Sequence, residues 1–102
     1  MSSGTKYVTR IRLAPDGYRH EHIEEIEYHH GVVIPPYDSP ELHYASVSVA
    51  ALLLDEHDWD VRVSGAPETV RLRTVHPYGR PPYLRGFADD APTNDLLDLP
   101  HY

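Results

Sequence analysis

Apolar and polar residues alternate over residues 7–13, a pattern typical of a half-buried β-strand. The strand is expected to turn Tyr7, Thr9, Ile11 and Leu13 to one face of a sheet. Because a Pro-Asp-Gly turn follows directly, the chain should reverse there and form a β-hairpin.

The second strand of this hairpin is expected over residues 18–28, and its pattern is irregular. Ile23 and Ile26 lie three positions apart, which suits either a helix or a bulged strand. The tight turn before them favours the bulge. Most of residues 32–44 is expected to be loop, because two adjacent prolines hold the backbone extended.

A short helix should follow, capped by Ser46 or Ser48 and ending at Glu56. Its expected apolar face consists of Val49, Leu52 and Leu53. A helix of this length is marginal alone, so it must pack against a sheet.

Two further strands are predicted downstream of the helix. Residues 59–63 alternate, with Trp59, Val61 and Val63 facing inward. Residues 69–76 alternate in the same way, with Arg71 and Arg73 on the outward side. The chain then runs through a rigid proline loop into an extended segment, and residues 94–99 should pack back through their leucines.

This order predicts an α+β fold. We expect a small antiparallel sheet of two β-hairpins in the order ββαββ, one helix packed on one face, and an extended C-terminal segment. Residues 1–5 are expected to form a disordered tail, and residues 6–102 a single domain.

The composition narrows the class of protein. A chain of 102 residues without cysteine forms no disulfide, thiolate nucleophile or cysteine-ligated zinc site. The N-terminus lacks the apolar core of a secretory signal, and no apolar run approaches the roughly 18 residues of a membrane span. We therefore expect a cytoplasmic protein with no membrane partner.

The charge and the absence of motifs narrow the function. A net charge of −7 with neutral histidines disfavours nucleic acid as a partner and favours a basic protein. The sequence contains no Gly-x-Ser-x-Gly, phosphate loop or dinucleotide fingerprint. We therefore expect neither an enzyme nor a cofactor.

Histidines offer one alternative. His20 and His22 would lie on one face of a strand, a spacing found in metal sites, and His29 and His30 follow nearby. A zinc or nickel site needs three or four ligands, and no complete ligand spacing is present. The competing interpretation is that these histidines face solvent on an edge strand.

Arginines offer another alternative. Arg10, Arg12, Arg71 and Arg73 occupy the outward faces of two strands, and they would form one basic stripe if those strands were neighbours. Such a stripe could bind nucleic acid or phosphate. The competing interpretation is cross-strand pairing with carboxylates, which the acidic net charge favours. The candidate carboxylates are Glu21, Glu25 and Glu27.

The tyrosine- and proline-rich loops suggest an interaction surface. One loop is Pro35-Pro36-Tyr37, and the other runs over residues 77–83. Rigid rings lose little entropy on binding, so exposed Tyr, Pro and Arg form good interfaces, although the tyrosines could instead cover a thin core. The expected partner-binding residues are Tyr78, Arg80, Tyr83, Arg85, Arg71 and Arg73.

The last quarter of the chain carries a resemblance. The segment Gly79-Arg80-Pro81-Pro82-Tyr83-Leu84-Arg85 is followed by Ala88-Asp89, by Asn94 and by Leu96-Leu97-x-Leu99-Pro100. Together with the opening Thr-Arg-Ile-Arg-Leu strand, this resembles an actinobacterial and actinophage family of domains of unknown function, number 3892 in that series. The resemblance implies a fold and no chemistry. The chain departs from the family pattern at Asp90, where a glycine is usual, and in the longer segment 32–45.

These observations lead to one expectation and its alternatives. We expect a non-catalytic protein-interaction or accessory module with an unidentified protein partner, able also to self-associate through an edge strand. The alternatives are a metal-binding protein built on the histidines, a nucleic-acid binder built on the arginines and tyrosines, and an acidic mimic of DNA.

Overall fold

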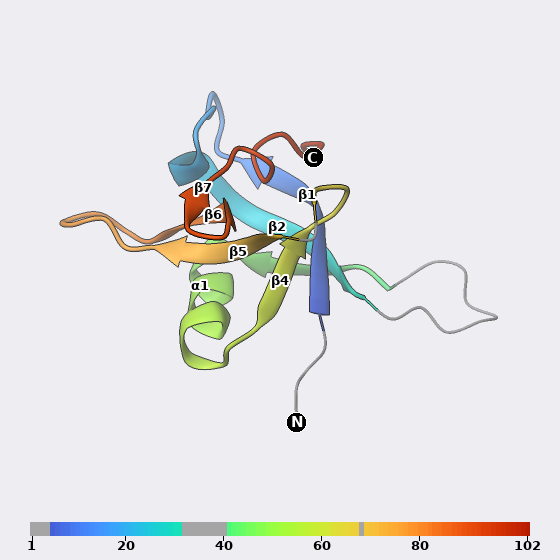
Figure 1. Ribbon diagram of the computed structural model, residues 1–102. Helices are drawn as coiled ribbons and strands as arrows, with labels where there is room; N and C mark the ends of the chain where they lie inside the picture. Colours follow the sequence, from blue (N-terminus) through green and yellow to red (C-terminus); the bar gives the residue numbers. More distant parts are fainter. Residues whose placement is uncertain (1–4, 32–40, 68) are drawn as a thin grey trace.

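The computed structural model describes residues 5–31, 41–67 and 69–102. Within them lies one mixed β-sheet with a single α-helix and a short 3-10 turn (Figure 1). The elements are β1 (Thr5–Leu13), η1 (His20–His22), β2 (Ile23–His30), β3 (His43–Ser46), α1 (Val47–Glu56), β4 (Asp60–Val63), β5 (Val70–Val75), β6 (Tyr83–Ala88) and β7 (Ala91–Pro92). The strand order across the sheet is β3-β2-β1-β4-β5-β6-β7.

The α+β class is confirmed, whereas the predicted ββαββ order of two hairpins is wrong. β3 adds a third strand to the first hairpin, starting in the last two residues of the stretch expected to be mostly loop, and β7 adds a short edge strand beside β6. The chain then crosses through α1, so β4 pairs parallel with β1 rather than antiparallel. Such a long-range pairing leaves no local signature in the sequence, because parallel neighbours are joined by a crossover.

Two irregularities shape the first hairpin. The register skips Glu24 in β2, so that Ile23 and Ile26 both face the core, which confirms the predicted bulged strand. The register also skips Thr9 in β1, which the alternation did not reveal. Before this bulge Lys6 and Val8 are the buried side chains, and after it Ile11 is.

The helix is capped as predicted, but it buries a different face. The Ser46 hydroxyl accepts a hydrogen bond from the Val49 amide at 3.3 Å. Ala50 and Ala51 are buried against the sheet, while Val49 and Leu52 are each 49% exposed. The expected apolar face is therefore wrong, because two adjacent alanines let the helix approach the sheet closely.

Over the described ranges, no helix has the length and apolar character needed to cross a membrane. Thr5, expected in a disordered tail, is the first residue of β1, and residues 1–4 lie outside the described part.

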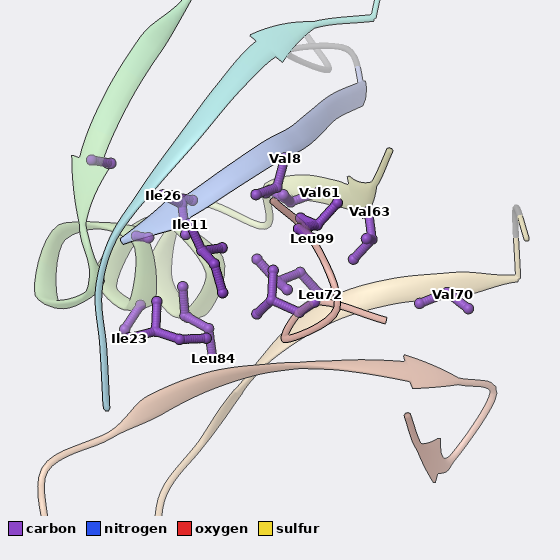
Figure 2. Close-up of a cluster of buried hydrophobic side chains, with 14 residues drawn as sticks. Val8, Ile11, Ile23, Ile26, Val61, Val63, Val70, Leu72, Leu84 and Leu99 are labelled. Atoms are coloured by element: carbon purple, nitrogen blue, oxygen red, sulfur yellow. The ribbon is translucent and has the colours of Figure 1, made fainter. Parts of the chain in front are cut away.

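The core is a single cluster that the C-terminal segment closes. Figure 2 shows side chains from β1, β2, β4, β5 and β6 meeting, with Leu99 among them. Leu96 is fully buried and Leu99 is buried, as predicted for the leucines of this segment. The Ile11 amide donates to the Pro100 carbonyl at 3.0 Å, and the Tyr102 amide donates to the Ile11 carbonyl at 3.0 Å. The segment thus pairs with the half of β1 that β4 leaves uncovered.

Candidate functional site: the β5–β6 hairpin

All six residues expected to bind a partner lie on the β5–β6 hairpin. The strands are paired so that Arg71 faces Phe87, Arg73 faces Arg85, and Val75 faces Tyr83. The side chains that alternate with these on each strand, such as Leu72 and Leu84, are buried. The three facing pairs therefore share the outward face of the hairpin. We call this set the hairpin face: Arg71, Arg73, Val75, Tyr83, Arg85 and Phe87.

The loop at the end of this hairpin carries Tyr78 and Arg80 and projects from the body of the molecule (Figure 1). The Arg80 amide donates to the Pro77 carbonyl at 3.3 Å, which closes a turn. Gly79 has a φ of +72°, a backbone conformation that residues with a Cβ rarely adopt. Tyr78 is fully exposed, so neither the core nor the sheet accounts for its position.

A groove lies between this loop and the segment that precedes β2. Its volume is about 480 Å³, and we call it the tip groove. Its lining residues are Tyr18, Arg19, Glu21, His22, Pro77, Arg80, Pro81, Pro82 and Tyr83. The two walls are far apart in the sequence, so the alternation of strand residues could not have predicted that they meet.

The wall before β2 is held in place by His22. Its Nδ1 accepts hydrogen bonds from the amides of Tyr18 at 3.0 Å and Arg19 at 3.1 Å. The His22 ring also meets Tyr18 edge-on at 5.4 Å, and the Arg19 guanidinium lies 5.3 Å from the Tyr18 ring. A Cβ on Gly17 would come within 2.6 Å of the His22 Cβ, so only glycine fits there. These contacts within the chain fix the position of this wall.

A second groove, of about 390 Å³, lies at the other end of the hairpin face. We call it the arginine groove, and its lining residues are Arg62, Thr69, Arg71, Arg73, Phe87 and Asp89. Arg62 of β4 stands directly opposite Arg71 of β5, and Arg71 in turn stands opposite Phe87.

The arginines of this groove differ in their surroundings. Arg73 bonds the Asp90 carboxylate at 3.2 Å and the Asp89 carbonyl at 3.3 Å, and it lies 5.2 Å from the Phe87 ring. Arg62 contacts Asp60 at 3.5 Å and has further interactions. Arg71 is exposed, and the structure gives its side chain no acidic partner among the described residues.

Arg85 also lies on the hairpin face, but it is hydrogen-bonded within the chain. Its Nε donates to the Thr93 carbonyl at 3.1 Å, and a terminal nitrogen donates to the Asn94 side chain at 3.2 Å. These bonds fasten the C-terminal segment to β6, so Arg85 has a clear intramolecular role.

The stripe that would have joined Arg10 and Arg12 to the hairpin arginines does not form, because β4 lies between β1 and β5. Arg12 contacts the Glu25 carboxylate at 3.6 Å, and Arg10 binds the Glu27 carboxylate with two nitrogens. The cross-strand pairing interpretation is thus confirmed for these two pairs, whereas Glu21 instead lines the tip groove.

Glu27 is the most enclosed carboxylate in this network, at 2% exposure. Besides Arg10, it accepts hydrogen bonds from the hydroxyls of Thr9 at 2.8 Å and Tyr44 at 3.0 Å. The hydrogen bond from Arg10 is the main cause that lowers the pKa of Glu27 to about 2, with smaller contributions from Thr9 and Tyr44. Burial alone would raise the pKa of this carboxyl.

The four histidines considered for metal binding lie in two places. His20 and His22 lie in η1, just before β2, and His29 and His30 end that strand, about 23 Å away at 3.3 Å per residue. His22 is engaged as described above, and His29 stacks on Tyr7 at 5.8 Å. Among the residues placed by the structure, no three His, Asp or Glu side chains converge on one point.

His20 differs from the other three histidines because it is buried, at 5% exposure. Its Nε2 has no hydrogen-bond partner in the described residues. Burial lowers the pKa of His20, and the nearby Arg85 charge lowers it further.

One cluster was not predicted. Tyr28 stacks on His43 at 5.4 Å and meets Trp59 edge-on at 5.8 Å, while the Lys6 ammonium lies 4.1 Å from the Trp59 ring. Burial lowers the pKa of Lys6. Because the bulge at Thr9 shifts the alternation in β1, the sequence pattern did not place Lys6 on the inward face. The Pro35-Pro36-Tyr37 loop, expected to form an interface, lies outside the described residues.

Comparison with known proteins finds no matching family model, no matching curated protein and no matching solved structure. The resemblance to the domain family of unknown function stays a prediction, and the function is argued from the surface of the chain.

Proposed function

We propose that the protein is a non-catalytic interaction module that binds an extended, acidic polypeptide segment in the tip groove. The observation that carries this proposal is the groove itself, built from two distant segments and lined by tyrosine, proline and arginine. Proline and tyrosine walls present large rigid surfaces that lose little entropy on binding.

The charge of the groove indicates the character of the partner. Arg19 and Arg80 line it with one opposing carboxylate, Glu21, so it is positive within a chain of net charge −7. Five of the nine Lys and Arg residues, namely Arg62, Arg71, Arg73, Arg80 and Arg85, lie on β4 and the hairpin. The net charge favoured a basic partner, but this local excess of arginine favours an acidic segment at the point of contact.

The grooves at the two ends of the hairpin face suit a chain that lies along it. Val75 and Tyr83 begin the face next to the tip groove, and Arg71 and Phe87 end it at the arginine groove. Along β5, Val75 and Arg71 are four residues apart, which corresponds to about 13 Å. A peptide of roughly five extended residues spans that length.

A peptide array with sequences of defined charge tests this proposal. Acidic peptides containing proline should bind, and the double variant Tyr78→Ala/Arg80→Ala should reduce that binding by at least about tenfold, the effect of losing one interface anchor. The matched control is Leu42→Ala/Arg12→Ala, which removes one exposed apolar residue and one arginine elsewhere. Preference for basic peptides, or equal loss in both double variants, would overturn it.

Two further parts of the proposal come from the sequence. A chain without cysteine suits the reducing cytoplasm. Self-association through β3, the edge strand at the other end of the sheet from the hairpin, is the competing hypothesis. The same array detects it if the binding peptide is residues 41–47 of this chain.

A further inference from the structure

We propose that the arginine groove is a binding site for a phosphate group. The site goes beyond the proposed peptide contact and does not depend on it. It is centred on Arg71, with Arg62, Arg73 and the Thr69 hydroxyl around it and Phe87 as a wall.

The first argument comes from charge placement within the sheet. Arg62 and Arg71 face each other directly across two strands, and Arg73 and Arg85 do the same one row along. Directly opposed side chains have Cβ atoms about 5 Å apart, and like charges in this position destabilise a sheet. A chain with only nine basic residues thus places four of them in two opposed like-charged pairs.

The second argument is the unequal compensation of these charges. Arg73 is bonded to Asp90 and to the Asp89 carbonyl, Arg62 contacts Asp60, and Arg85 is bonded to the C-terminal segment. Arg71 stands between Arg62 and Phe87 and forms no ion pair among the described residues, although Asp89 also lines the groove. An anion bound to Arg71 would relieve its repulsion with Arg62.

The third argument concerns the chemistry of the lining. Guanidinium groups are planar forks whose parallel N–H donors match two oxygens of a phosphate, whereas a single carboxylate offers only two oxygens in total. A phosphate has enough oxygens for two arginines and the Thr69 hydroxyl together. The Asp89 carboxylate in the lining opposes any anion, so binding requires the combined charge of the arginines that line the groove.

The same phosphate chemistry could be carried by free phosphate or by a phosphorylated side chain of a protein. Amide chemical shifts should be followed while the protein is titrated with inorganic phosphate and, separately, with a phosphoserine peptide, at constant ionic strength. Saturable shifts confined to residues 62, 69–73 and 87–89 are expected. Tighter binding of the peptide assigns the phosphate to a protein partner, and equal affinity assigns it to a free ligand.

The variants make the test specific. Arg71→Ala should weaken binding at least about tenfold, because a hydrogen bond to a charged group is lost. Arg71→Lys should bind phosphate with an affinity between those of the unaltered chain and Arg71→Ala, since it keeps the charge but loses the planar pair of donors. Arg80→Ala, in the tip groove, should leave phosphate binding unchanged. It should instead reduce acidic-peptide binding, so failure of one site can be told from failure of the other.

Two results would overturn the phosphate site. One is the absence of saturable shifts with either ligand once ionic strength is held constant. The other is binding by Arg71→Ala with the affinity of the unaltered chain, which would show an adventitious ion only.

Discussion

Replacing Glu27 by glutamine should destabilise the protein, and by an amount that depends on pH. The carboxylate is 2% exposed and accepts hydrogen bonds from Arg10, Thr9 and Tyr44 across three neighbouring strands. Glutamine keeps the shape but turns one acceptor into a donor that faces the Arg10 guanidinium. The charge-assisted bonds are then lost while their partners remain in place.

The magnitude follows from the kind of bond lost. A hydrogen bond to a charged group contributes about 1.5–3 kcal/mol, so the free energy of unfolding at neutral pH should fall by about 2 kcal/mol. For a domain of this size, each kcal/mol shifts Tm by about 4–8 °C, so Tm should fall by about 8–16 °C. The side chain of Arg10 is 41% exposed and stays hydrated, which keeps the loss below that of a fully buried ion pair.

The pH dependence gives the sharper result. The pKa of Glu27 is lowered from 4.5 to about 2 in the folded protein, so its contribution is fully present above about pH 4.5. That contribution is lost as the pH falls toward 2. The stability gap between the unaltered chain and Glu27→Gln should therefore narrow over this window.

Urea unfolding of both proteins across pH 2–7 measures the gap, with Glu24→Gln as the matched control. Glu24 is an exposed carboxylate on the same strand, and its substitution should change stability by less than about 0.5 kcal/mol. A gap that stays constant with pH, or that is no larger than the control's, would refute the assignment of Glu27 as an ionised buried carboxylate.

Three further predictions concern stability. Leu96→Ala should cost about 2–5 kcal/mol in urea unfolding, because this fully buried leucine fastens the C-terminal segment, and a smaller loss would contradict that role. Arg85→Ala should lower the free energy of unfolding by about 1 kcal/mol, whereas Arg80→Ala should change it by less than about 0.5 kcal/mol. Equal effects would contradict the hydrogen bonds assigned to Arg85. Ala51→Leu should destabilise the protein by about 1–3 kcal/mol through overpacking, while Leu52→Ser should be tolerated. A larger loss for Leu52→Ser than for Ala51→Leu would mean that the helix buries the face expected from the sequence.

Local patterns in the sequence predicted the elements whose signals are local. The Ser46 cap, the bulge between Ile23 and Ile26, and the alternation of residues 70–75 all appear in the structure as expected. What failed depended on distant residues. The parallel pairing of β1 with β4 needs a crossover that no short window contains.

In the candidate site too, features that depend on local sequence were predicted and features that depend on distant residues were not. Alternation correctly placed Arg71 and Arg73 on an outward face, and the Tyr and Pro residues marked an exposed loop. The opposite wall of the tip groove, from Tyr18 to His22, came from another part of the chain and could not be predicted from spacing. The intramolecular role of Arg85 was also hidden, because its acceptors Thr93 and Asn94 reach it only after the C-terminal segment folds back.

The most direct test of the interaction module is capture from a lysate of the source organism or its host, at low and at moderate salt. The bait is either the unaltered chain or a folded Tyr78→Ala/Arg80→Ala variant, and bound protein and nucleic acid are both identified. We expect one stoichiometric protein with an acidic extended segment, retained at moderate salt, lost with the variant, and bound again when purified. Equal capture by both baits, or recovery of nucleic acid alone, would contradict the account.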